Sequence, residues 1–188
     1  MKLLKATILF GLIAILWGFT YSDESDPLGE YAYYKLDDSN RRTSDIIRSG
    51  YSETEVVAYD SETANYKVRM KYKFKLNPTG TRSGEDHLTV EAYYFSDEFL
   101  VELRESGYYE TPDFKVRHEG FGNAADTYGT VYEDCDILRF FDIRDSDVND
   151  LEIKAYVHPS VPVLRAVTLD FKGEYNRLRL KAGLDYRP

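Results

Sequence analysis

Five basic side chains occupy every second position between residues 67 and 75, and this pattern is the one in the sequence best suited to binding chemistry. Lys67, Arg69, Lys71, Lys73 and Lys75 alternate with large apolar residues. Residues two apart share one face of a β-strand, and a rise of about 3.3 Å per residue would spread the five charges over about 27 Å. The spacing predicts a basic strand face that binds an acidic glycan, a lipid phosphate or an acidic protein.

A second, shorter set of basic residues follows the same rule near the C-terminus. Arg177, Arg179 and Lys181 alternate with leucines, so they are expected to extend the anionic-partner site if the two strands share a sheet face. The alternative is a solvated face whose charges are partly paired. Aligning the apolar residues of a hairpin predicts that Lys73 lies opposite Glu91, which would neutralise part of the basic face.

The acidic stretch 142–150 contains the only pattern that suggests a metal. Asp145, Asp147 and Asn149 match the first three side-chain ligands of an EF-hand calcium loop. The match ends at Asp150, where the loop needs glycine, and at Tyr156, where it needs glutamate. The stretch is therefore either a looser calcium loop or a solvated turn whose side chains cap their own backbone. No other cofactor is predicted.

Catalytic residues are not identifiable from the sequence. His87, His118 and His158 fall on separate predicted strands or at their ends, without metal-ligand spacing. His118 and Glu119 are neighbours that could act as acid and base, although a structural histidine is the usual interpretation. Cys135, flanked by two aspartates, is predicted to be a buried, unreactive thiol. A pair of catalytic carboxylates cannot be selected from 33 acidic residues.

Composition and charge narrow the class of protein. The chain has 188 residues and a formal net charge of −9, with 17 tyrosines and 10 phenylalanines. This size and apolar content suit one folded domain, and the negative charge argues against a nucleic-acid binder. The tyrosine doublets, such as Tyr33-Tyr34, should place one ring on each face of a strand.

The N-terminus predicts export. Residues 6–19 form an almost unbroken apolar run after Lys2 and Lys5, which is typical of a signal peptide and short for a bilayer span of roughly 20 residues. We expect residues 1–22 to be a signal peptide or a short membrane anchor, and 23–188 to be the globular domain. A single cysteine excludes an intramolecular disulfide, which favours a bacterial periplasmic or extracellular setting. Membrane contact is expected only if residues 6–19 are retained.

Alternation of apolar and polar residues predicts an antiparallel β-sandwich or barrel of about eight strands. The strands are expected near residues 31–36, 55–59, 66–76, 87–95, 114–118, 130–141, 151–157, 163–171 and 175–184. Ser96-Asp97 before the apolar residues of 99–103, closed by Ser106-Gly107, indicate one short capped helix. Residues 43–49 are expected to form a second helical turn ended by Gly50.

These observations favour an exported binding or interaction module at the cell envelope, with a protein, glycan or lipid headgroup as partner. The alternatives are a secreted glycan-active enzyme that uses carboxylates in a sandwich cleft, and a barrel that holds a small apolar ligand.

Overall fold

The structure is a computed structural model, and it describes residues 28–40, 43, 45–76, 80–91, 97–111, 114–142, 152–161, 165–172 and 176–182. The predicted signal segment, the acidic stretch around Asp145, Asp147 and Asn149, and the doublet Tyr93-Tyr94 lie outside these residues.

The described residues form ten strands and one helix. In chain order these are β1 (Tyr31–Asn40), β2 (Ile46–Asp60), β3 (Asn65–Leu76), β4 (Thr81–Glu91), α2 (Asp97–Ser106), β5 (Tyr108–Glu110), β6 (Phe114–Ala125), β7 (Val131–Asp142), β8 (Glu152–Val157), β9 (Ala166–Lys172) and β10 (Asn176–Ala182).

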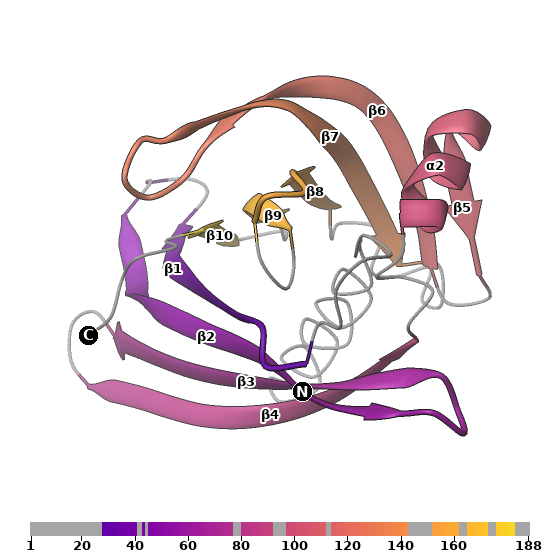
Figure 1. Ribbon diagram of the computed structural model, residues 1–188. Coiled ribbons are helices and arrows are strands. Elements are labelled where there is room, and N and C mark those ends of the chain that lie inside the picture. The colour runs from indigo at the N-terminus through magenta and orange to yellow at the C-terminus, as the bar shows by residue number, and fades with distance from the viewer. Residues whose placement is uncertain are drawn as a thin grey trace.

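All ten strands belong to one antiparallel sheet with the order β4-β3-β2-β1-β10-β9-β8-β7-β6-β5. Two meanders, β1 to β4 and β5 to β10, meet where the first strand pairs with the last. Figure 1 shows the sheet curling so that β3 and β4 lie across the molecule from β6 and β7. The prediction of a mostly β, antiparallel fold is confirmed, with ten strands in place of about eight.

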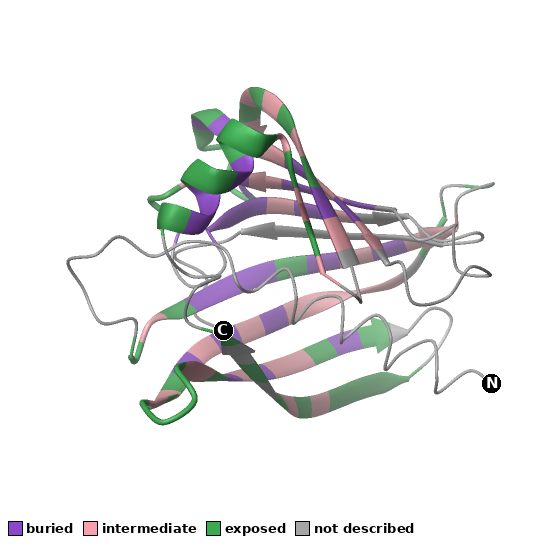
Figure 2. Cartoon of the chain, turned by 90° about the vertical axis from the view of Figure 1, so that its right-hand side faces the viewer, coloured by how far each residue is buried: buried purple, intermediate pink, exposed green. Residues whose placement is uncertain are grey.

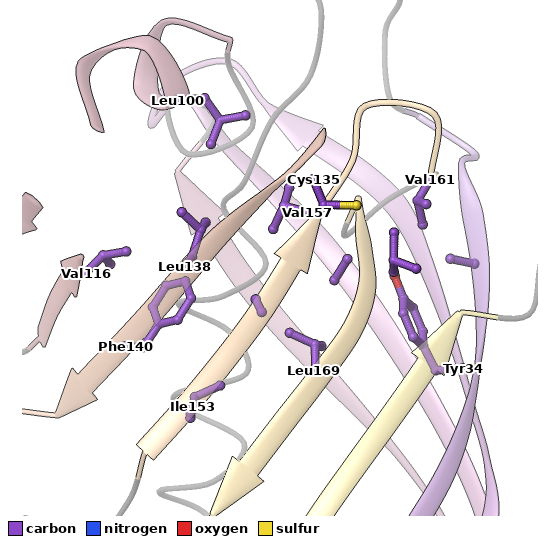
Figure 3. Close-up of a cluster of buried hydrophobic side chains, with 14 of the residues drawn as sticks. Tyr34, Leu100, Val116, Cys135, Leu138, Phe140, Ile153, Val157, Val161 and Leu169 are labelled. Atoms are coloured by element: carbon purple, nitrogen blue, oxygen red, sulfur yellow. The ribbon is translucent and has the colours of Figure 1, made fainter. Parts of the chain in front are cut away.

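The hydrophobic core lies on the inner face of the curled sheet. We call the face that carries Val68 and Met70 of β3 the inner face, and the face that carries the alternating lysines the outer face. Buried side chains from β1, β3 and β6 to β9 form one cluster, shown in part in Figure 3. Strand alternation produces this cluster directly, since Ile153, Ala155 and Val157 of β8 are all buried.

The helix α2 completes the core beside β5 and β6. Phe99, Leu100 and Leu103 are buried, at the i, i+1 and i+4 spacing of one helix face. Arg165 Nη1 reaches Asp97 Oδ1 at 3.0 Å, which fixes the first turn of the helix. No helix of the described part is long and apolar enough to cross a membrane.

The helical turn expected at residues 43–49 is wrong, because β2 begins at Ile46. Gly50 does not end a helix. It lies in mid-strand opposite Phe74, where an added Cβ would come within 2.1 Å of the Lys73 carbonyl oxygen. Glycine is therefore required for the close approach of β2 to β3.

The predicted register of the hairpin between β3 and β4 is also wrong. Strand β4 begins at Thr81 in place of His87, so Lys73 lies opposite Ser83 and Lys71 lies opposite Glu85. Residues 81–86, which precede the strand expected at 87–95, are also strand because their backbone pairs with β3. Glu91 consequently lies opposite Asn65, far from the lysines it was expected to neutralise.

Candidate binding surface

The alternation predicted for β3 is confirmed. Val68, Met70 and Phe74 are buried on the inner face, while Lys67, Lys73 and Lys75 are exposed on the outer face. Arg69 and Lys71 are half-buried between neighbouring strands. The five basic residues therefore line one side of a strand that the apolar core holds in place.

Two of the five basic residues have acidic partners. Arg69 forms an ion pair with Glu55 of β2, and this hydrogen bond raises the pKa of Arg69. Lys71 Nζ lies 3.9 Å from Glu85 Oε2 of β4, with Glu53 opposite on β2. The middle of the basic strand is thus partly neutralised, as the alternative interpretation expected.

The next row of the outer face contains no carboxylate. Lys35 of β1, Tyr51 of β2, Lys73 of β3 and Ser83 of β4 lie side by side in register. Lys35 is 53% exposed and its Nζ lies 3.1 Å from Asp37 Oδ2, two residues along β1. We call Lys35, Tyr51 and Lys73 the basic row. It places one ammonium group on each side of the Tyr51 ring position.

The C-terminal basic residues belong to the same sheet face by register. On β10, position 181 is opposite Lys35 of β1, and position 179 is opposite Asp37. Strand β10 is three positions from β3 in the sheet order, which is about 14 Å at the usual strand spacing. Position 181 therefore continues the register of Lys35 by one strand, whereas position 179 is opposite Asp37 on one side and Asp170 on the other.

Tyrosines adjoin the basic row on the outer face. The rings of Tyr33 and Tyr51 have centroids 6.1 Å apart, and Tyr31 packs edge-on against Tyr33 at 5.0 Å. Burial raises the pKa of Tyr33. The expectation that tyrosine doublets put one ring on each face holds here, since Tyr34 is buried on the inner face.

The buried carboxylate Asp136 of β7 is the centre of the best-connected polar cluster. Arg104 of α2 donates from Nε to Oδ1 at 2.8 Å and from Nη2 to Oδ2 at 2.7 Å. His118 of β6 approaches Oδ1 with Nε2 at 3.0 Å, and because a carboxylate only accepts, Nε2 carries the hydrogen. Phe121 packs against the His118 ring. The cluster ties α2 to the sheet, and His118 contacts Asp136, as a structural histidine would.

The other buried carboxylates of the described residues also have partners. Arg48 Nε donates to Asp38 Oδ2 at 2.6 Å. Asp126 Oδ1 accepts hydrogen bonds from the backbone N–H groups of Tyr128 and Thr130 at 2.8 and 2.9 Å. These contacts are those of structural carboxylates, so the geometry gives no specific support to the glycan-active enzyme.

Metal ligands do not gather in the part of the chain that the structure describes, where no group of three His, Cys, Asp or Glu side chains could hold an ion. His87 Nε2 lies 2.9 Å from Glu85 Oε1, and His158 Nδ1 lies 2.7 Å from Ser160 Oγ. The calcium prediction for Asp145, Asp147 and Asn149 stays a prediction.

Cys135 of β7 is buried, as predicted. Burial raises the pKa of its thiol, and the neighbouring aspartates act in the same direction. Its Sγ contacts the Tyr132 carbonyl oxygen at 3.4 Å. The thiol is held in its unreactive, protonated form.

Lys35 and Tyr51 are the surface residues that sequence reasoning missed. Residues 31–36 were expected to form a strand. Period-two alternation within that strand would have assigned Lys35 to the outer face, opposite to Leu36. Tyr51 gave no such signal, because Ser49, Gly50 and Ser52 around it are typical of a turn.

Comparisons with known proteins assign this chain to no family. No family model matches it, and no curated protein matches it. Among solved structures, a protein described as a candidate lipoprotein from Parabacteroides distasonis matches over 88% of this chain and 98% of its own, with 8% identity and a TM-score of 0.37. A candidate exported protein with a YmcC-like fold from Bacteroides fragilis matches over 88% and 99%, with 9% identity and a TM-score of 0.41. These scores describe a distant similarity of chain path.

Proposed function

We propose that this protein is an exported binding module of the cell envelope that recognises an acidic glycan through the outer face of β10, β1, β2 and β3. The observation that carries the proposal is the basic row, in which Lys35 and Lys73 flank Tyr51. Lys35 is paired with Asp37 along its own strand, and Lys73 is exposed opposite Ser83. Export rests on the apolar run at residues 6–19 after two lysines.

The basic row suits a sugar polymer that carries carboxylates or sulfates. Lys35 and Lys73 are two strands apart, so their backbones are separated by about 10 Å. A sugar ring stacked on Tyr51 would place acidic groups of the neighbouring units within reach of both ammonium groups. Aromatic rings bind sugar faces and lysines bind anions, and the row offers both on one rigid sheet.

The local charge contrasts with that of the whole chain. The net charge of −9 repels polyanions at long range, so binding would depend on short-range contacts at this face. Exposed ion pairs are screened by salt, with a Debye length of about 10 Å at 0.1 M. Affinity for the glycan should therefore fall steeply as the salt concentration rises.

The test compares binding of the purified protein to immobilised polygalacturonate, to neutral dextran and to vesicles of phosphatidylglycerol, at 50 and 500 mM NaCl. We expect saturable binding to polygalacturonate that weakens at least tenfold at the higher salt. The double variant Lys35→Glu/Lys73→Glu should abolish it.

The matched control is Lys115→Glu/Arg117→Glu on β6, which changes the net charge equally at the far end of the sheet. Its glycan binding should stay within twofold of the unmodified protein. Equal losses in both variants, or binding that prefers dextran, would contradict the proposal. Binding to the vesicles alone would assign the face to a lipid headgroup.

A further inference from the structure

The two edges of the sheet differ in how well they are protected. At one edge β5 has only three residues, and α2 lies beside it. At the other edge β4 runs for eleven residues, Thr81–Glu91. Figure 1 shows β4 along the rim of the sheet, and Figure 2 shows it to be largely exposed. An edge strand of this length presents about 36 Å of backbone.

Strand β4 lacks three of the features that protect edge strands from pairing, namely proline, lysine and a bulge. It contains no proline and no lysine, and its ladder with β3 continues without a register shift from Asn65↔Glu91 to Lys75↔Thr81. Bulges interrupt the ladders between β2 and β3 and between β6 and β7. A regular edge with alternate N–H and C=O groups facing outward is a template for an added strand.

The charges on β4 select the kind of strand that can be added. Glu85, Asp86 and Glu91 outnumber Arg82, the one arginine of the strand. On its paired side β4 already faces a strand with a basic outer face, where Lys71 meets Glu85 at 3.9 Å. Glu85 already contacts His87 through Oε1, so a second basic strand on the free side would share this carboxylate with Lys71 and His87. Glu91, which faces Asn65, would gain a cation.

The same charges disfavour pairing with a second copy. Full antiparallel overlap of two β4 strands about a two-fold axis centres on residue 86, which places Asp86 directly opposite its own copy. Like charges directly opposite are destabilising, and each copy carries a net charge of −9. Pairing of β4 with a basic segment of another protein is therefore favoured over pairing of β4 with a second copy of itself.

We propose that β4 is a docking edge for an extended, basic segment of a partner protein, which joins the sheet as an eleventh strand. The backbone supplies the hydrogen bonds of this strand addition, and Glu85 and Glu91 supply its preference for lysine or arginine at alternate positions. This site is separate from the basic row. The basic row binds an acidic ligand, whereas the β4 edge binds a basic one.

The probe is a fluorescent peptide with the sequence of β3 itself, Asn65–Leu76, because that sequence already pairs with β4 on the other side. A matched peptide carries glutamate at each of its five basic positions. We expect the basic peptide to bind the purified protein saturably in fluorescence anisotropy and the acidic peptide not to bind. Amide hydrogen exchange should slow in residues 81–91 when the basic peptide is added.

Charge reversal tests the edge directly. Glu85→Lys/Glu91→Lys should weaken binding of the basic peptide at least tenfold, whereas Glu105→Lys/Glu133→Lys, with the same change in net charge on exposed positions elsewhere, should stay within twofold. Equal losses in the two variants, slowed exchange confined to other strands, or no binding of either peptide would overturn the proposal. A β4-dependent dimer in sedimentation would also overturn it, since the edge would then belong to a second copy. The Lys35→Glu/Lys73→Glu variant should bind the peptide normally, so the two proposals fail independently.

Discussion

Replacement of Gly50 by alanine is expected to destabilise the protein strongly, because the site has no room for a methyl group. An ideal Cβ on Gly50 would lie 2.1 Å from the Lys73 carbonyl oxygen and 2.5 Å from the Phe74 Cα. Both atoms belong to the backbone of β3, so neither can rotate away. Strands β2 and β3 would have to separate by about 1 Å near the Arg48↔Leu76 end of their ladder.

The expected magnitude follows from three contributions. Overpacking of this kind costs about 1–3 kcal/mol, and the two ladder hydrogen bonds expected to stretch cost about 1 kcal/mol each. Alanine in a strand recovers about 0.5–1 kcal/mol relative to glycine. The free energy of unfolding should therefore fall by about 2–4 kcal/mol. With a urea m-value of about 2 kcal/mol/M, the midpoint should fall by about 1–2 M.

Gly84→Ala is the matched control. Its added Cβ would meet the Tyr72 hydroxyl at 2.2 Å, which is the far end of a side chain that can rotate. We expect a change within about 1 kcal/mol in either direction. Urea unfolding of both variants, followed by circular dichroism, measures the difference. Equal midpoints would refute the inference that β2 and β3 approach too closely for a side chain at Gly50.

Two further predictions concern buried polar groups. Asp136→Ala should lower the free energy of unfolding, measured by urea titration, by about 2–3 kcal/mol, because it removes the shared acceptor of Arg104 and His118. A loss below about 1 kcal/mol would contradict the structural role of the cluster. Burial raises the pKa of Tyr34 well above 10. Above about pH 10 the folded state therefore keeps a proton that the unfolded state loses, so the free energy of unfolding should fall as the pH rises. Tyr34→Phe should make that decline shallower, and it should raise or maintain stability at pH 7, because the buried hydroxyl has no hydrogen-bond partner among the residues that the structure describes. An unchanged alkaline decline in thermal scans would show that Tyr34 does not contribute to it.

Strong alternation made much of the fold predictable from the sequence. The inner and outer faces of β3 and β8 follow directly from period-two patterns, and the helix at 97–106 follows from its capping residues and apolar spacing. The N-terminal half of β2 was missed because its inner face is polar and small, with Ser52 and Thr54 where other strands carry large apolar residues. Local composition there resembles a turn, and only pairing with β1 and β3 on both sides makes it a strand.

Only one part of the candidate site, the basic face of β3, could be predicted from the sequence. A basic face on β3 can be read from one strand, but the neighbours that neutralise or extend it depend on register. A shift of the β4 register removed Glu91 from the lysines and brought Glu85 to Lys71. The basic row joins residues from β1, β2 and β3, so no local pattern in the sequence contains it.

The pairing of β1 with β10 has a consequence for when the protein can fold. Tyr34 lies opposite Ala182 in the middle of the sheet, so the ladder that unites the two meanders needs both ends of the chain. Such long-range pairing forms slowly. A chain still being synthesised lacks its last strand and cannot close the sheet. Since every other ladder joins consecutive strands, the two meanders can form first, and the sheet is completed only when β10 of a released chain pairs with β1.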